Sequence, residues 1–171
     1  MDRFVSNTIN RVDKKGRVSI PASFRAVLGD QSKLHAILSV ERPVIEAGGA
    51  DFLESNLQRL SQMDPLSEEY EMWSFCLVGD ADELKIDTEG RIILSDQIRE
   101  HTGITDQVAF VGRGHFFQLW EPAEFEAYRK SARDAVRQMR RSLGAANTQK
   151  ISDFPTGSER SDPSGSGEGQ S

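Results

Sequence analysis

Cysteine is nearly absent from this sequence of 171 residues, in which Cys76 stands alone. A single cysteine cannot form an internal disulfide, and this usage is typical of the reducing cytoplasm. No apolar run approaches the roughly 18 residues of a membrane-spanning helix, and the first residues lack the apolar stretch of a signal peptide. We therefore expect a cytoplasmic protein without a membrane partner.

Histidines and catalytic motifs are equally scarce. The three histidines, His35, His101 and His115, are far apart and have no cysteine or carboxylate at metal-ligand spacing. The sequence contains no Gly-x-Ser-x-Gly elbow, no Walker loop and no dinucleotide fingerprint. No nucleophile is paired with a base. The sequence thus predicts no metal site, no cofactor, no small-molecule substrate and no catalytic residue.

The charged residues are unevenly distributed along the chain. They make up 28% of the sequence, and the net charge of −6 argues against indiscriminate binding to nucleic acid. Residues 1–30 nevertheless hold six arginines and lysines against three aspartates, a local charge of +3. Residues 67–89 are strongly acidic instead. This polarity predicts that one face binds a polyanion such as DNA and another repels it.

An internal repeat is the most informative feature of the sequence. The segment 13–20, Asp-Lys-Lys-Gly-Arg-Val-Ser-Ile, returns 74 positions later as the segment 87–94, Asp-Thr-Glu-Gly-Arg-Ile-Ile-Leu. The same alignment superposes Arg25 on Arg99. Repetition over this length indicates two copies of one supersecondary unit.

Each copy begins with a turn whose residues have separate roles. The aspartate can accept hydrogen bonds from backbone N–H groups two residues on, and the glycine supplies a positive φ angle. The arginine that follows either bridges back to the aspartate or reaches out to a ligand, and the sequence leaves both readings open. The expected turn-capping residues are Asp13, Gly16, Asp87 and Gly90.

The same order of elements is predicted in both copies. Two short strands flank the turn as a β-hairpin, a short helix follows, and two more strands complete the unit. In the first copy these elements are expected at residues 8–12, 17–20, 22–28, 34–40 and 43–46. In the second they are expected at 83–86, 91–94, 96–102, 107–111 and 115–120.

Helices are expected between and after the copies. Leu53, Leu57, Leu60 and Met63 form an amphipathic stripe, and a second helix ends near residue 79. A long helix after Pro122 carries a basic run. This run is either a solvated face, a secondary phosphate contact, or a contact with the acidic residues 68–71 of another subunit. The predicted domains are a first repeat at 7–54, connecting helices at 55–82, a second repeat at 83–126, a C-terminal helix at 127–143 and a disordered tail at 144–171.

The duplicated Asp-x-x-Gly-Arg motif resembles the swapped-hairpin fold of the AbrB/SpoVT DNA-binding superfamily. Pro21-Ala22-Ser23-Phe24-Arg25 after the first motif supports this likeness. Two such units in tandem, with the strand Phe116-Phe117-Gln118-Leu119-Trp120-Glu121, resemble the MraZ family from about residue 1 to about residue 143. The resemblance implies an α+β fold of two swapped-hairpin β-barrel units with joining and following helices.

The resemblance also implies a function. MraZ-like proteins are bacterial, nucleoid-associated regulators of the division and cell-wall gene cluster, and their ring-shaped homo-oligomers bind short direct repeats in double-stranded DNA upstream of their own gene. By position, their DNA-contacting arginine corresponds to Arg17, with Arg91 as its counterpart. The alternative is an antitoxin-like or scaffold protein of the same fold that binds a protein partner. The expected DNA-binding residues are Arg17, Lys14, Lys15, Arg91, Arg11 and Arg3.

The two copies differ at the turn tip and after the second strand. Lys14 and Lys15 in the first tip are replaced by Thr88 and Glu89 in the second, and Pro21 is replaced by Ser95. We therefore expect the first turn to contribute more to DNA binding than the second.

Overall fold

The computed structural model describes residues 2–152, and of 147–152 it describes the backbone alone. The chain divides into two units, Met1–Arg129 and Lys130–Ser171, which are described separately. Most of the predicted tail, residues 144–171, lies outside the described residues. The helix expected to end at residue 143 continues to Ser152.

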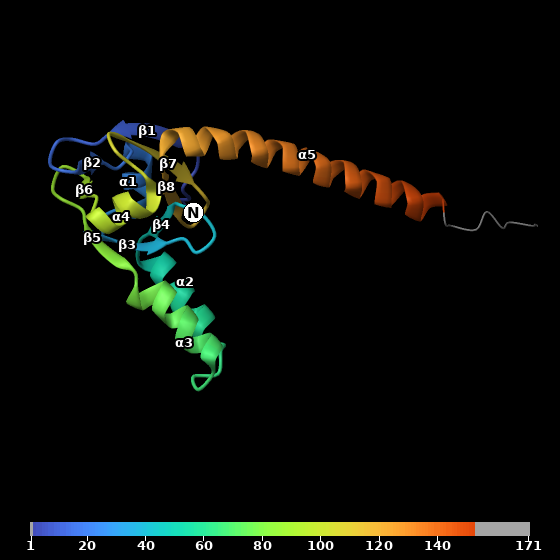
Figure 1. The fold of residues 1–171 in the computed structure, drawn as a ribbon, viewed down its shortest axis with the longest axis horizontal. Coiled ribbons are helices and arrows are strands. Elements are labelled where there is room, and N and C mark those ends of the chain that lie inside the picture. The colour runs from blue at the N-terminus through green and yellow to red at the C-terminus, as the bar shows by residue number, and fades with distance from the viewer. Residues whose placement is uncertain (1, 153–171) are drawn as a thin grey trace, which may run out of the picture. The chain divides into compact units, whose positions relative to one another are not determined.

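The elements follow the order that the repeat predicts (Figure 1). The first copy comprises β1 (Asn7–Arg11), β2 (Arg17–Ser19), α1 (Ala22–Leu28), β3 (Lys33–Leu38), β4 (Ile45–Gly48) and α2 (Ala50–Ser61). The helix α3 (Glu68–Ser74) and a π-turn, η1 (Phe75–Gly79), lead to the second copy. That copy comprises β5 (Asp82–Lys85), β6 (Arg91–Ile93), α4 (Asp96–Thr102), β7 (Gln107–Gly112), β8 (Phe117–Trp120) and α5 (Pro122–Ser152).

The two copies exchange strands. The described strands form a six-stranded antiparallel sheet in the order β1-β7-β8-β4-β3-β5 and a separate two-stranded ribbon, β2-β6. Each copy thus supplies its turn, but the strands on either side of that turn pair with the other copy. The predicted hairpins are wrong in this respect, because β1 pairs with β7 and β2 with β6 rather than with each other. The α+β swapped-hairpin fold is confirmed.

The larger apolar cluster of the described residues joins both copies. Val18 and Ile20 from the first copy and Ile92 and Leu94 from the second are nearly inaccessible to solvent and belong to the same apolar cluster. Phe24 packs against Phe4, Phe110 and Phe117, with ring centroids 5.1–6.4 Å apart. Burial of each such side chain stabilises the fold by about 1.5–3 kcal/mol. The boundaries drawn between the repeats stay a proposal, since in space the repeats share this core.

The connecting helices and the start of α5 cover other parts of the sheet. The helices α2 and α3 contact each other beside β3 and β4 (Figure 1). The first turns of α5 place Phe125 and Tyr128 on Trp120, with a stacked Trp120–Tyr128 pair at 4.7 Å. Among the described residues, no helix combines the length and the apolar character that crossing a bilayer requires.

Candidate nucleic-acid interface

The first turn is held by a single carboxylate. Asp13 Oδ1 accepts hydrogen bonds from the backbone N–H groups of Lys15 and Arg17, both at 2.9 Å. Asp13 Oδ2 lies 2.7 Å from Arg17 Nε in an ion pair. Gly16 has φ +80° and donates to the Asp13 carbonyl at 3.0 Å. The arginine is thereby fixed at the start of β2 with its Nε engaged, and among the described residues its two terminal nitrogens form no hydrogen bond.

The second turn repeats this geometry. Asp87 Oδ1 accepts from the backbone N–H groups of Glu89 and Arg91 at 2.9 Å, and Asp87 Oδ2 lies 2.9 Å from Arg91 Nε. Gly90 has φ +76°. Local sequence therefore determines the turn, because an aspartate, a glycine and an arginine at the same spacing give the same bonds twice.

These bonds shift the ionisation of the turn residues. The backbone N–H of Arg17 contributes most to lowering the pKa of Asp13 below 3.8, and the N–H of Arg91 does the same for Asp87. The hydrogen bond from Arg91 to Asp87 raises the pKa of Arg91 in turn. Both turns are therefore ion pairs at neutral pH.

The turns differ in the charge that they present. In the first, three cations against one carboxylate leave +2, and among the described residues Lys14 and Lys15 form no salt bridge. In the second, one cation stands against two carboxylates, and Arg91 forms a further ion pair with Glu89 at 3.2 Å. The residues of the first turn therefore carry a net positive charge, and those of the second carry a net negative charge.

The ribbon β2-β6 places one turn at each of its ends (Figure 1). The N–H of Leu94 donates to the Gly16 carbonyl at 2.8 Å, and the N–H of Ile20 donates to the Gly90 carbonyl at 3.0 Å. Three residue pairs separate the turns, about 10 Å of strand. Each turn is therefore anchored by the other copy.

Arg25 and Arg99, which the repeat aligns with each other, each contact the turn of the other copy. The sequence alone assigned no role to either. A Cβ atom built on Gly90 would lie 2.4 Å from Arg25 Cδ, so Arg25 packs on the second turn. A Cβ atom built on Gly16 would lie 3.8 Å from Arg99 Nη2, so Arg99 flanks the first turn. Their superposition in the repeat is the signal that the sequence offers, but their positions depend on the strand exchange.

The other expected DNA-binding residues are not all near the turns. Arg11 is exposed at the end of β1, two residues before Asp13. Arg3 precedes Phe4, which pairs with Gly114 at the opposite end of β1. The structure thus brings Lys14, Lys15 and Arg17 together in the first turn. Arg11 lies just before that turn, whereas Arg3 lies beyond the opposite end of β1.

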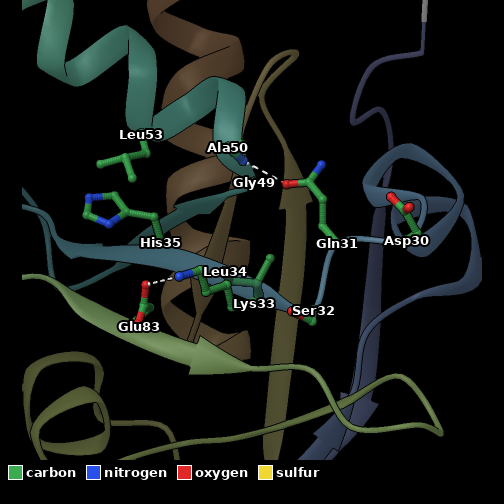
Figure 2. A pocket seen from close by; sticks show the side chains of 10 residues that line it. All are labelled: Asp30, Gln31, Ser32, Lys33, Leu34, His35, Gly49, Ala50, Leu53 and Glu83. Atoms are coloured by element: carbon green, nitrogen blue, oxygen red, sulfur yellow. Dashed lines mark hydrogen bonds and ion pairs between the residues drawn. The ribbon is translucent and has the colours of Figure 1, made fainter.

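A pocket of about 330 Å³ lies elsewhere, where β3 meets the start of α2 (Figure 2). Several of its polar groups are already paired: Gln31 Oε1 accepts from the Ala50 N–H at 2.7 Å, and Lys33 Nζ lies 2.7 Å from Glu83 Oε1. In the described part of the chain no cluster of histidine, cysteine or carboxylate side chains could hold a metal ion. The first turn is therefore the better candidate for a binding site.

Comparison with known proteins gives consistent matches. The family model described as "MraZ protein, putative antitoxin-like" matches residues 77–143. The chain is 44% identical over 147 residues to "Transcriptional regulator MraZ" of Beijerinckia indica, covering 85% of this chain and 90% of the relative. It is 44% identical to the Azorhizobium caulinodans protein of that name and 40% identical to the Rickettsia canadensis one, covering 86% of this chain and 95% and 100% of those relatives. All are named as regulators and none as an enzyme.

Proposed function

This chain belongs to the MraZ family of transcriptional regulators, and from that premise we propose that its first turn binds DNA. The target is a set of short direct repeats upstream of its own gene, in the division and cell-wall gene cluster. The protein acts there as a ring-shaped homo-oligomer in the cytoplasm, at the nucleoid. The charge difference between two turns of the same geometry supports this proposal best.

Arginine is suited to the role that Arg17 has here. Its planar fork binds two phosphate oxygens or the N7 and O6 atoms of guanine, and a two-stranded ribbon fits the major groove. The ion pair with Asp13 uses Nε, so the two terminal nitrogens can bind DNA. Lys14 and Lys15 add mobile positive charge beside it.

One turn has too few charges for tight binding, so the proposal requires several. In a ring, docking of one turn raises the effective concentration of its neighbours, and avidity exceeds single-site affinity by about 100-fold or more. Regularly spaced turns then favour regularly spaced DNA sites.

Replacement of Arg17 by alanine tests this function. We expect Arg17→Ala to abolish binding to the DNA upstream of the gene in a mobility-shift titration, with oligomer size unchanged by light scattering. Arg91→Ala, the matched change in the acidic turn, should weaken binding much less. The log–log salt slope should decrease by about 0.9 for every phosphate that a variant no longer neutralises.

Two results would count against DNA binding through this turn. Wild-type affinity in Arg17→Ala would remove the role of the arginine. A salt-independent affinity of the unmodified protein would show that phosphate contacts do not drive the interaction.

A protein partner is the second candidate, favoured by apolar side chains exposed around α3. Met72, Phe75 and Val78 are 42–58% exposed there. Such side chains suit a protein surface better than a duplex. A pull-down that returns a stoichiometric small protein, together with no retention of DNA, would favour this antitoxin-like function.

A further inference from the structure

Arg99 lies beside the first turn, and no carboxylate among the described residues pairs with it. It belongs to α4 of the second copy, yet its guanidinium flanks Gly16 of the first. In the described part of the chain it forms no salt bridge, and its Nε is buried without a hydrogen-bond partner. An unpaired buried donor destabilises the folded state, and more so when it is charged.

The surroundings of Arg99 increase this cost. The adjacent turn has a local charge of +2, contributed by Lys14, Lys15 and Arg17 against Asp13. The only carboxylate of that turn is already engaged by Arg17 Nε and two backbone N–H groups. The arrangement lacks an anion, and a bound phosphate would supply one.

Arg25, the equivalent residue of the first copy, is in a different electrostatic setting. It is exposed and its Nη1 donates to the Glu89 carbonyl at 3.4 Å. It lines a hollow of about 320 Å³ together with Asp87 and Thr88 of the acidic turn. Arg25 therefore already has an acceptor and lies next to negative charge, which makes it a matched control.

We propose that Arg99 completes the phosphate-binding site of the first turn, so that each such site is built from both copies. The ligand class is the DNA phosphodiester, and the inference rests on the proposed function. The guanidinium of Arg99 approaches the backbone of the duplex while Lys14, Lys15 and Arg17 approach from the turn itself. The strand exchange thereby gives the second copy a direct part in the binding site of the first.

Salt-dependent titration of Arg99→Gln on the DNA upstream of the gene tests the inference. We expect the log–log salt slope to fall by about 0.9 for each engaged protomer, with affinity about eightfold lower per phosphate at 0.1 M salt. Arg99→Lys should retain the slope because it keeps the charge. Arg25→Gln should leave both slope and affinity close to those of the unmodified protein.

Thermal unfolding separates a phosphate-binding role from a structural one. Phosphate binding predicts that the Tm of Arg99→Gln is unchanged or raised, because an unpaired donor is removed. A wild-type salt slope in Arg99→Gln would overturn the inference, whether affinity is kept or falls with the Tm. If Arg17→Ala loses binding while Arg99→Gln keeps the wild-type slope, this inference fails and the proposed function stands. Retained binding in Arg17→Ala would overturn the proposed function itself.

Discussion

At the scale of residues, neighbouring side chains decide what each turn arginine offers. Arg17 and Arg91 make the same bond to an aspartate, at 2.7 and 2.9 Å. Only Arg91 meets a second carboxylate among the described residues, that of Glu89. The charge available at the surface is therefore determined by the tip residue rather than by the arginine.

Glu89→Lys should convert the second turn into a DNA-binding turn. The substitution removes an ion pair with Arg91 and changes the local charge from −1 to +1. We expect higher affinity for the DNA upstream of the gene and a salt slope steeper by about 0.9 per engaged protomer. Glu54→Lys, the same charge change on the exposed side of α2, is the control. An equal gain in both variants would indicate a general effect of net charge.

The partly buried carboxyl of Glu46 should make the stability of the folded protein depend on pH. Burial raises the pKa of this carboxyl above 4.5, because the charged form loses hydration in the folded state. Between 4.5 and the raised pKa the folded state binds more protons than the unfolded state, so stability falls as pH rises through this window. Thermal scans should therefore show that Glu46→Gln raises the Tm at pH values above the window and has little effect below pH 4.

Glu83 serves as a control, because its pKa is shifted in the opposite direction to that of Glu46. A hydrogen bond from Lys33 lowers the pKa of Glu83 below 4.5. Its favourable contribution is present at neutral pH and is lost as pH falls through the lowered pKa. Thermal scans across pH should show Glu83→Gln destabilised at neutral pH and similar to the unmodified protein in acid. Parallel pH profiles for the two variants would contradict both assignments.

At the scale of elements, the second turn and the C-terminal end of α4 both contain a glycine, but they depend on it to different degrees. Gly90 and Gly103 both have positive φ angles, of +76° and +73°. A Cβ atom on Gly90 would meet Arg25, whereas one on Gly103 would have nothing within 4 Å. An alanine at Gly103 would therefore introduce backbone strain alone, whereas an alanine at Gly90 would also displace the Arg25 side chain.

Gly103→Ala should lower the free energy of unfolding by about 1–2 kcal/mol, the cost of a left-handed conformation for an L residue. Gly90→Ala should cost more, because the new methyl group also displaces Arg25. Urea unfolding measures both, and in an Arg25→Ala background the excess at Gly90 should vanish. An excess that persists would show that Arg25 is not the obstacle.

Sequence predicts those parts of the fold that local signals determine. The helices at 22–28 and 96–102 are predicted at the bounds observed, because proline or serine precedes each and glycine follows. The predicted stripe on α2 is partly wrong: Phe52, Asn56 and Leu60 are buried, and Leu57 is 41% exposed. Strand exchange cannot be predicted from local sequence, because the same turn is compatible with strands that pair with each other and with strands that pair with another copy. The position of Arg99 depends on that exchange.

At the scale of the whole molecule, neither copy has a complete sheet of its own. Without the second copy, β1 loses β7, β2 loses β6, β3 loses β5 and β4 loses β8. We expect a fragment of residues 1–81 to form no folded monomer, as judged by circular dichroism and light scattering. Mixing it with residues 82–171 should restore cooperative unfolding. A cooperative, monomeric fragment 1–81 would contradict the shared core.

The first unit should remain folded without the rest of α5. Phe125 and Tyr128 pack on Trp120, and Arg129 donates to Asn7 at 3.2 Å, so a chain ending at Arg129 keeps these interactions. We expect its Tm to match that of the full chain. Light scattering then tests the basic run beyond residue 129. A smaller assembly indicates a subunit contact, and an unchanged one indicates a solvated face or a phosphate contact. A large fall in Tm would show that the later helix stabilises the first unit.

The pairing of β1 with β7 has a consequence for biosynthesis. β1 ends at Arg11, and its partner begins at Gln107. Ribosomes add roughly 5–20 residues per second, so β1 waits on the order of 5–20 s for its partner to be translated. During that interval its edge is open to strands of nascent chains on neighbouring ribosomes of the same message. Polysomes are therefore where intermolecular exchange of these strands would begin, before any chain is released.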